Sequence, residues 1–363
     1  MREHVRPAYP RGGGGLRFRG KLSYDGTDFG GWQTQPSGNT VQDLLETRLS
    51  RLLRCPIHVA ASGRTDAGVH AKGQIFHFEL PPAASRPGLL AEVPADAAGL
   101  AEWHAASAAA LGKALSGLPE NTGLPPSVHV HGIWPAPPSF HARESRVGVC
   151  YAYTVLEGCG CPFTSRYCWA VGRRALDVER MAEAAQLLVG EHDFSTFAVR
   201  NPTDSRTPVK RMRRLDVTRE PHYSGLAADG GGGVVVIRAE CDRFLQHMMR
   251  LISGTLVQVG LGRVSVSDMA SLLHACGRKD LSIASLVFKA PPQGLCLERC
   301  FYAEDCPDGW VVAKQMEQPC SDGVPTTTVA AGDNYTSMTD HEPTLVMNRE
   351  ALTGTDPLAT PTA

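Results

Sequence analysis

The sequence predicts an α+β fold made of two similar split β-α-β units with mainly antiparallel sheets. Three observations support this class. The chain has 363 residues, enough for two domains that each bury a core. Short segments rich in β-branched and aromatic residues, typical of strands, occur in both halves. Segments in which apolar residues recur at helical spacing separate these strands in the same order in each half.

The first unit opens with a strand expected over residues 16–24 (LRFRGKLSY), where apolar residues partly alternate. Asp25-Gly26-Thr27 then predicts a turn. Thr40 and Asp43 have the spacing of a capping box, which marks the start of a helix. The apolar residues after this box predict an amphipathic helix of about 14 residues. They are Val41, Leu44, Leu45, Leu49, Leu52 and Leu53.

Two further strands are expected over residues 55–61 (CPIHVAA) and 74–80 (QIFHFEL). Between them, residues 63–70 (GRTDAGVH) form a turn with glycines near both ends. Residues 81–126 are rich in Ala, Pro and Gly, and we interpret them as a peripheral insertion with a helix near 101–115.

The connection to the second unit is expected to be a strand over residues 128–134 followed by the proline-rich linker 135–138 (PAPP). The second unit then begins with a strand over 149–156 (VCYAYTVL). A helix follows from Asp177 to Val189, and Gly190 is expected to end it.

The second unit continues with strands over 213–219 and 234–241, separated by the glycine loop 230–233. Residues 244–259 predict a long helix that is apolar on most faces and therefore largely buried. A last strand over 295–303 (LCLERCFYA) is expected to close the sheet.

The predicted domain division follows from these elements. Residues 1–15 form a flexible basic tail, and residues 16–135 form the N-terminal α+β domain with the insertion 81–126. Residues 136–305 form the C-terminal α+β domain, and residues 306–363 form a mostly disordered acidic tail.

The distribution of charge favours a polyanionic partner. Residues 315–363 contain seven acids and one arginine, so the rest of the chain carries +5 although the net charge is −1. Clustered Lys and Arg supply the nonspecific part of nucleic-acid affinity. A solvated basic face is the alternative that charge alone leaves open.

Composition excludes several other classes. No run of about 18 apolar residues occurs, so no membrane partner is expected. The 11 cysteines include no pair of CxxC elements, so we expect reduced thiols and no metal. The first 21 residues contain six basic residues and no apolar stretch, which argues against a secretory signal. The compartment stays open, with the cytoplasm favoured and a plastid or mitochondrion as the alternative.

The turn 63–70 presents Asp66 on a rigid connection between strands, with Arg64 two residues before it. Arg250 is a charged residue in the helix that is expected to be buried, beside Met249, Leu251 and Ile252. A charge in such a place needs a partner. We expect these two groups to pair, and an adjacent arginine favours the ionised carboxylate that a nucleophile or base requires. A purely structural ion pair is the alternative.

Two other segments hold candidate residues. Tyr151 and Tyr153 lie on the same face of their strand, either at a site or as core aromatics whose hydroxyls reach the surface. Residues 201–214 (NPTDSRTPVKRMRR) have the form of a phosphate-contacting loop, or of an ordinary basic strand. Their basic residues are Arg206, Lys210, Arg211, Arg213 and Arg214.

Short motifs in a fixed order extend these observations along the chain. They are Tyr24-Asp25-Gly26-Thr27, Gly31-Trp32-Gln33-Thr34-Gln35, Val41-Gln42, Gly63-Arg64-Thr65-Asp66-Ala67-Gly68-Val69-His70, Phe140-His141-Ala142-Arg143, Tyr151-x-Tyr153, Gly190-Glu191-His192-Asp193-Phe194, Arg206-Thr207-Pro208, His247-Met248-x-Arg250, Gly254-Thr255-Leu256 and Gly294-Leu295. With them the sequence resembles the TruA family of tRNA pseudouridine synthases over residues 17–302.

The resemblance implies a pseudouridine synthase fold, in which the two units join into one central sheet with the active-site cleft between them. It also implies isomerisation of uridine to pseudouridine in the anticodon stem-loop of tRNA, at positions 38 to 40, by a homodimer without metal or organic cofactor. Asp66 matches the catalytic aspartate of the family, Tyr151 its active-site tyrosine, and Arg250 the arginine that pairs with the aspartate. Arg64 matches the arginine beside the flipped nucleotide.

For tRNA contacts we expect Arg143, Arg206, Lys210 and Arg211. The chain departs from the family where Val149 and Cys150 precede the tyrosine in place of basic residues. Two other functions are weighed. One is an inactive tRNA-binding protein or RNA chaperone of the same fold, and the other is an Asp-dependent glycosidase-like hydrolase, which needs a second carboxylate such as Asp25 or Asp28.

Overall fold

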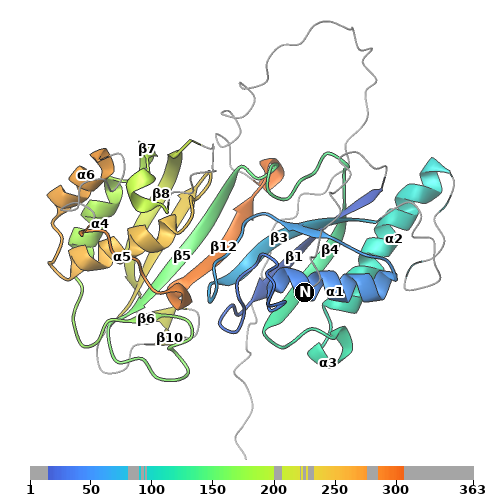
Figure 1. Cartoon of the computed structure of the whole chain (residues 1–363), viewed down its shortest axis with the longest axis horizontal. Helices are drawn as coiled ribbons and strands as arrows, with labels where there is room; N and C mark the ends of the chain where they lie inside the picture. The colour runs from blue at the N-terminus through green and yellow to red at the C-terminus, as the bar shows by residue number, and fades with distance from the viewer. Residues whose placement is uncertain are drawn as a thin grey trace, which may run out of the picture. The chain divides into compact units, whose positions relative to one another are not determined.

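The architecture is taken from a computed structural model of the chain (Figure 1). The structure describes residues 15–80, 90, 94, 96–199, 207–220, 222–223, 226–227, 233–275 and 285–305. The chain divides into two units at Met316, and all described residues lie in the first. The predicted tails, except Gly15, and most of the loop 230–233 lie outside the described residues.

The N-terminal strands form one part of a large sheet. Strand β1 (Leu16–Tyr24) pairs antiparallel with β3 (His70–Leu80) on one side and with β4 (Val128–Ala136) on the other. The short β2 (Val59–Ala61) pairs with β3. Every second residue of β1 from Phe18 on is buried, as the alternation in its sequence predicts.

The C-terminal strands form the other part of the same sheet. Strand β5 (Gly148–Leu156) pairs antiparallel with β11 (Val234–Cys241), which pairs with β8 (Val209–Glu220). The edge strand β7 (Gly190–Asp193) pairs with β8, and β6 (Trp169–Ala170) pairs in parallel with β5. All nine residues of β5 are buried, because both faces of this strand are covered.

Strand β12 (Leu295–Phe301) joins the two parts. It pairs in parallel with the start of β3 and antiparallel with β5, so the sheet runs β4-β1-β3-β12-β5-β11-β8-β7 (Figure 1). The sequence predicted that this strand closes the sheet, and that prediction was wrong: the last long strand lies in the middle. The predicted α+β class with one mostly antiparallel central sheet is confirmed. A separate ribbon pairs β9 (His222–Tyr223) with β10 (Leu226–Ala227).

Three helices lie between the N-terminal strands along the chain. Helix α1 (Val41–Leu53) follows the N-cap Thr40, whose hydroxyl accepts from the backbone N–H of Asp43, one of the two hydrogen bonds of the predicted capping box. Helix α2 (Ala97–Leu115) lies along β4 and starts four residues earlier than predicted, at the cap Asp96. A short helix, α3 (Pro119–Thr122), follows it.

The C-terminal helices are α4 (Val178–Gln186), α5 (Met248–Gly260) and α6 (Val266–His274), which lie beside the C-terminal strands in Figure 1. Helix α4 ends three residues before the predicted Val189. Helix α5 starts four residues later than predicted, because His247 has φ +61° and cannot belong to a right-handed helix. One apolar core runs through both halves of the sheet.

Several further boundaries differ from the sequence prediction; for example, β3 starts at His70, four residues before its predicted start. Pro135 and Ala136 belong to β4 opposite Phe18 and Arg17, so the linker between the units is shorter than expected. Strand β8 begins at Val209, four residues before its predicted start. Within the described ranges, no helix has the length and apolar character needed to cross a membrane.

Candidate active site

The turn of residues 63–70 connects β2 to β3 and presents Asp66, as the sequence predicted. The buried Gln74 holds the first residue of the turn from both sides. Its side-chain Nε2 donates to the carbonyl of Gly63 at 2.7 Å, and its Oε1 accepts from the N–H of Gly63 at 3.3 Å. Strand β3 therefore fixes where the turn begins.

A neighbouring loop fixes the middle of the turn. The N–H of Trp32 donates to the carbonyl of Thr65 at 3.1 Å, and the Thr65 hydroxyl lies 2.8 Å from that of Tyr24. Gly31 has φ +96°, and a Cβ added there would lie 2.7 Å from the Thr65 oxygen. Only glycine allows the chain to pass this close to Asp66.

The first turn of α5 supplies the partner of Asp66. The Arg250 guanidinium donates from Nη1 to Asp66 Oδ2 at 3.2 Å and from Nε to the carbonyl of Ala290 at 2.8 Å. The predicted pairing of Arg250 with Asp66 is thus seen as a contact. The Arg250 side chain is 12% exposed and that of Asp66 is 32% exposed, so the carboxylate is open to a substrate.

His247 is a second neighbour of the carboxylate, with Nε2 at 3.4 Å from Asp66 Oδ2. Burial lowers the pKa of His247; the charge of Asp66 raises it in part, and Lys289 and Arg250 lower it again. The Lys289 amine lies 3.4 Å from the same imidazole nitrogen, and burial lowers the pKa of Lys289 as well. Arg250 and His247 therefore both contact Asp66, and Lys289 lies next to His247.

Tyr151 lies beside the turn, on strand β5. Its ring is 8% exposed and packs edge-on against Phe244 at 5.1 Å between centroids. Its hydroxyl lies 3.8 Å from the position a Cβ would take at Gly63. Burial raises the pKa of Tyr151, so the phenol keeps its proton at neutral pH. Tyr153, on the same face, donates to the carbonyl of Pro291, as a core tyrosine would.

A buried arginine accompanies Tyr151. Arg146 is 7% exposed, and its Nη1 donates to the Ser62 carbonyl at 2.9 Å, just before the turn. Its charge favours ionisation of Tyr151, against the larger effect of burial. Arg64, in contrast, is exposed and extends from the turn without a polar contact to any residue that the structure describes.

The far end of the turn is tied to the other half of the sheet. His70 accepts from the N–H of Gly26 through Nδ1, and its Nε2 lies 2.8 Å from the Arg166 carbonyl. This pattern assigns a neutral imidazole with the proton on Nε2, and burial lowers the pKa of His70 accordingly. Arg166 and Tyr167 also donate to the Asp25 carboxylate. Asp25 is therefore engaged in this bridge.

Of the residues predicted to contact tRNA, the neighbours Lys210 and Arg211 lie on one strand and Arg143 lies on another segment. Arg143 lies in the loop between β4 and β5, and Arg211 is exposed on β8. Lys210 is 8% exposed, and its amine donates to the carbonyls of Thr207 and Val209. Arg206 lies outside the described residues. The role of all four in RNA binding stays a prediction.

Sequence reasoning missed three residues of the site. His247 was visible in its motif, but nothing in the sequence indicated that it starts the helix beside Asp66. Arg146 stands just before the strand that carries Tyr151, and no pattern there indicated a place beside the turn. Nothing in the sequence pointed to Lys289, because only folding brings its segment to the site. Among the described residues, no group of three or more His, Cys, Asp or Glu side chains could hold a metal ion.

Comparisons with known proteins identify the family of the chain. A family model described as tRNA pseudouridine synthase matches residues 22–105 and 184–303. The chain is 34% identical over 294 residues to tRNA pseudouridine synthase A of Syntrophotalea carbinolica, covering 79% of this chain and 97% of that protein. It is 38% identical over 291 residues to the protein of the same name from Solidesulfovibrio magneticus, covering 79% and 91%. The chain therefore belongs to the TruA family of tRNA pseudouridine synthases.

Proposed function

We propose that this isomerase converts uridine to pseudouridine in the anticodon stem-loop of tRNA, with Asp66 as the reacting carboxylate. The observation that carries the proposal is the position of Asp66. It is partly exposed on a turn held from three sides, paired with Arg250 at 3.2 Å and next to the protonated phenol of Tyr151. An ion pair that served stability alone would have no need of a rigid, open carboxylate.

The reaction itself needs no oxidant or reductant. The bond between ribose C1′ and uracil N1 breaks, the base turns within the site, and a bond forms between C1′ and C5. The hydrogen that C5 loses is replaced in the product by one on N1, so substrate and product contain the same atoms. We therefore propose that the chain works without metal or organic cofactor.

Each residue of the site has a role in this scheme. Asp66 either attacks the sugar at C1′ or removes a proton from it, and Arg250 holds the carboxylate in position. Tyr151 stacks on the uracil or directs its hydroxyl toward C5. Arg64 extends into solvent from the same turn, where it fills the space that the flipped nucleotide leaves.

The rest of the chain serves to bind the RNA. We propose that residues 16–135 and 136–305 act as two domains on either side of the target nucleotide, and that Arg143, Arg206, Lys210 and Arg211 meet tRNA phosphates. We also propose a homodimer. The +5 charge outside residues 315–363 supports the attraction of a polyanion.

Incubation of the full chain with an unmodified tRNA transcript, followed by mapping of pseudouridine, tests the proposal. We expect pseudouridine in the anticodon stem-loop. Binding without any product would favour an inactive RNA-binding protein, release of free uracil would favour a hydrolase, and product only outside this stem-loop would contradict the substrate assignment.

The two routes open to Asp66 are separated by deuterium at ribose C2′. If the carboxylate removes the hydrogen at C2′, the reaction is slower with the deuterated substrate. Direct attack on C1′ leaves the bond from C2′ to this hydrogen intact, so no such slowing is expected. A single-turnover rate on tRNA with deuterated uridine measures the difference.

A further inference from the structure

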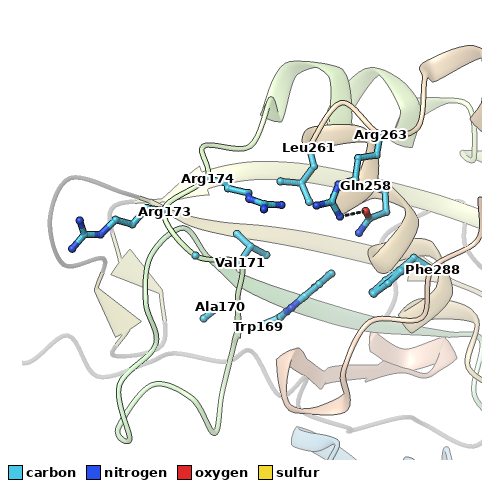
Figure 2. A pocket seen from close by; sticks show the side chains of 10 residues that line it. Trp169, Ala170, Val171, Arg173, Arg174, Gln258, Leu261, Arg263 and Phe288 are labelled. Carbon is cyan, nitrogen blue, oxygen red and sulfur yellow. Dashed lines mark hydrogen bonds between the residues drawn. The ribbon is translucent and has the colours of Figure 1, made fainter.

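A pocket of about 440 Å³ lies on the C-terminal half of the sheet, and its lining includes none of the groups that contact Asp66 (Figure 2). Its walls come from β6 and the residues after it, from the end of α5, and from the segment before β12. The lining residues are Trp169, Ala170, Val171, Gly172, Arg173, Arg174, Gln258, Leu261, Arg263 and Phe288. Three of these ten are arginines, and none is acidic.

The arginines are available for an anion. Arg174 and Arg263 are exposed and point toward the interior of the pocket, whereas Arg173 points away from the other side chains (Figure 2). Within the described ranges, no carboxylate pairs with any of them, and Arg263 donates one N–H to Gln258 at 3.0 Å. Cations gathered in a concave site raise the local potential, which a phosphate neutralises.

An aromatic pair forms the opposite wall. The rings of Trp169 and Phe288 are stacked, with centroids 5.7 Å apart and planes within 5°. Phe288 remains 43% exposed, which is unusual for a side chain of this size and leaves ring surface open. Aromatic surface beside arginines is the combination that binds a nucleobase together with its phosphate.

The segment that carries Phe288 also reaches the active site. Lys289, the next residue, lies 3.4 Å from His247, and the carbonyl of Ala290 accepts from Arg250 Nε at 2.8 Å. Arg250 in turn contacts Asp66. The two-residue step from Phe288 to Ala290 spans at most about 7 Å. The pocket therefore lies close to Arg250, which contacts Asp66.

We propose that this pocket binds a phosphate and the adjoining base of the RNA strand next to the target nucleotide. Arg174 and Arg263 hold the phosphate, and the Trp169–Phe288 pair supports the base. This inference rests on the proposed function, because the ligand is RNA delivered to Asp66, and it adds a binding site that none of the motifs in the sequence indicated.

The test compares the wild-type chain with Arg174→Gln, Arg263→Gln and their double variant. Arg173→Gln is the matched control, because it loses the same charge from a side chain that points away from the other lining residues (Figure 2). Affinity for an unmodified tRNA transcript is measured at several salt concentrations. We expect the double variant to bind about tenfold more weakly and its log K against log salt slope to fall by about 1. Phe288→Leu is expected to weaken binding several-fold without changing the slope.

Unchanged affinity and slope in the double variant, or an equal loss in Arg173→Gln, would overturn the inference. A second arm titrates uridine monophosphate into the wild-type chain by calorimetry. If the double variant loses tight binding of uridine monophosphate but keeps its affinity for tRNA, the pocket is a site for a free nucleotide. That result would also overturn the RNA assignment. If the wild-type chain forms no pseudouridine but the arginine variants still lose tRNA affinity, the proposed function fails while the pocket stands.

Discussion

The two halves of the sheet contribute to the site in different ways. The N-terminal half holds Asp66 through its backbone, because Gln74 and Trp32 bond main-chain atoms of the turn. The C-terminal half meets the same carboxylate with the ends of long side chains, chiefly Arg250 and His247. One half therefore determines where the acid is, and the other determines its electrostatic surroundings.

This difference separates the effects of substitutions. A change that moves the turn should alter stability and activity together, whereas a change in the opposing side chains should alter activity more than stability. Strand β12 pairs with both β3 and β5, so it keeps the two contributions in register. Variants in each half of the sheet test that separation.

Replacing Gly31 by alanine should be the most damaging change. The residue has φ +96°, and a Cβ would lie 2.7 Å from the Thr65 oxygen. We expect Gly31→Ala to lower the free energy of unfolding by about 3 kcal/mol and to remove most activity. Chemical denaturation and single-turnover rates measure both quantities.

Gly38→Ala is the matched control for this change. Gly38 also has a positive φ, +68°, but nothing lies within 4 Å of an added Cβ. Only backbone strain of about 1 kcal/mol is then expected, with normal activity. Equal losses in the two variants would show that the close approach of Gly31 to the turn does not position Asp66.

Replacing Arg250 by methionine tests the contribution of the other half. The variant keeps an apolar stem but loses the donors to Asp66 and to Ala290. We expect a loss of about 1 to 2 kcal/mol in stability, because Asp66 is partly solvated, and a loss of at least about 100-fold in single-turnover rate.

Arg250→Lys is the companion variant. Lysine keeps the positive charge but lacks the planar guanidinium that donates to both Asp66 and the Ala290 carbonyl. Partial recovery of rate is expected. Kinetics and melting of Arg250→Met that match the wild-type chain would contradict the pairing as a functional contact.

The smallest effect is a pH dependence in the N-terminal half. Burial, with His141 and Arg17 nearby, lowers the pKa of His77 to about 3 from an ordinary 6.5. Below pH 6.5, His77 is protonated in the unfolded chain but stays neutral in the folded chain. The free energy of unfolding therefore falls as the pH drops toward 3. At pH 5.5 this loss is roughly 1 kcal/mol relative to pH 7.5.

His77→Gln should remove that part of the pH dependence, because glutamine keeps an acceptor for the N–H of Ala142 without titrating. Unfolding free energies at the two pH values provide the comparison. An identical difference in the variant and in the wild-type chain would show that His77 does not contribute.

Local patterns predicted most of the elements. The strands over 16–24 and 234–241 have the predicted bounds, because side-chain alternation and apolar runs are short-range signals. The start of α1 was predicted from the Thr40 cap. The contact between Arg250 and Asp66 was also predictable, since a charge in an apolar helix requires a partner.

What the sequence did not predict depends on distant pairings. The central place of β12 follows from its register against β3 and β5, which no local pattern specifies. The bridge from Arg166 to Asp25 links residues far apart along the chain. The sequence suggests that Lys210 is a cation on the surface. In the structure its amine donates to the backbone carbonyls of Thr207 and Val209.

In the proposed reaction, Asp66 reacts with the nucleotide. The most direct test is the single-turnover rate of pseudouridine formation by Asp66→Asn, measured beside its tRNA affinity and melting temperature. We expect a rate at least about 10³-fold lower, equivalent to about 4 kcal/mol, with affinity within a few-fold of the wild-type chain. A folded Asp66→Asn variant that forms pseudouridine within about tenfold of the wild-type rate would contradict it.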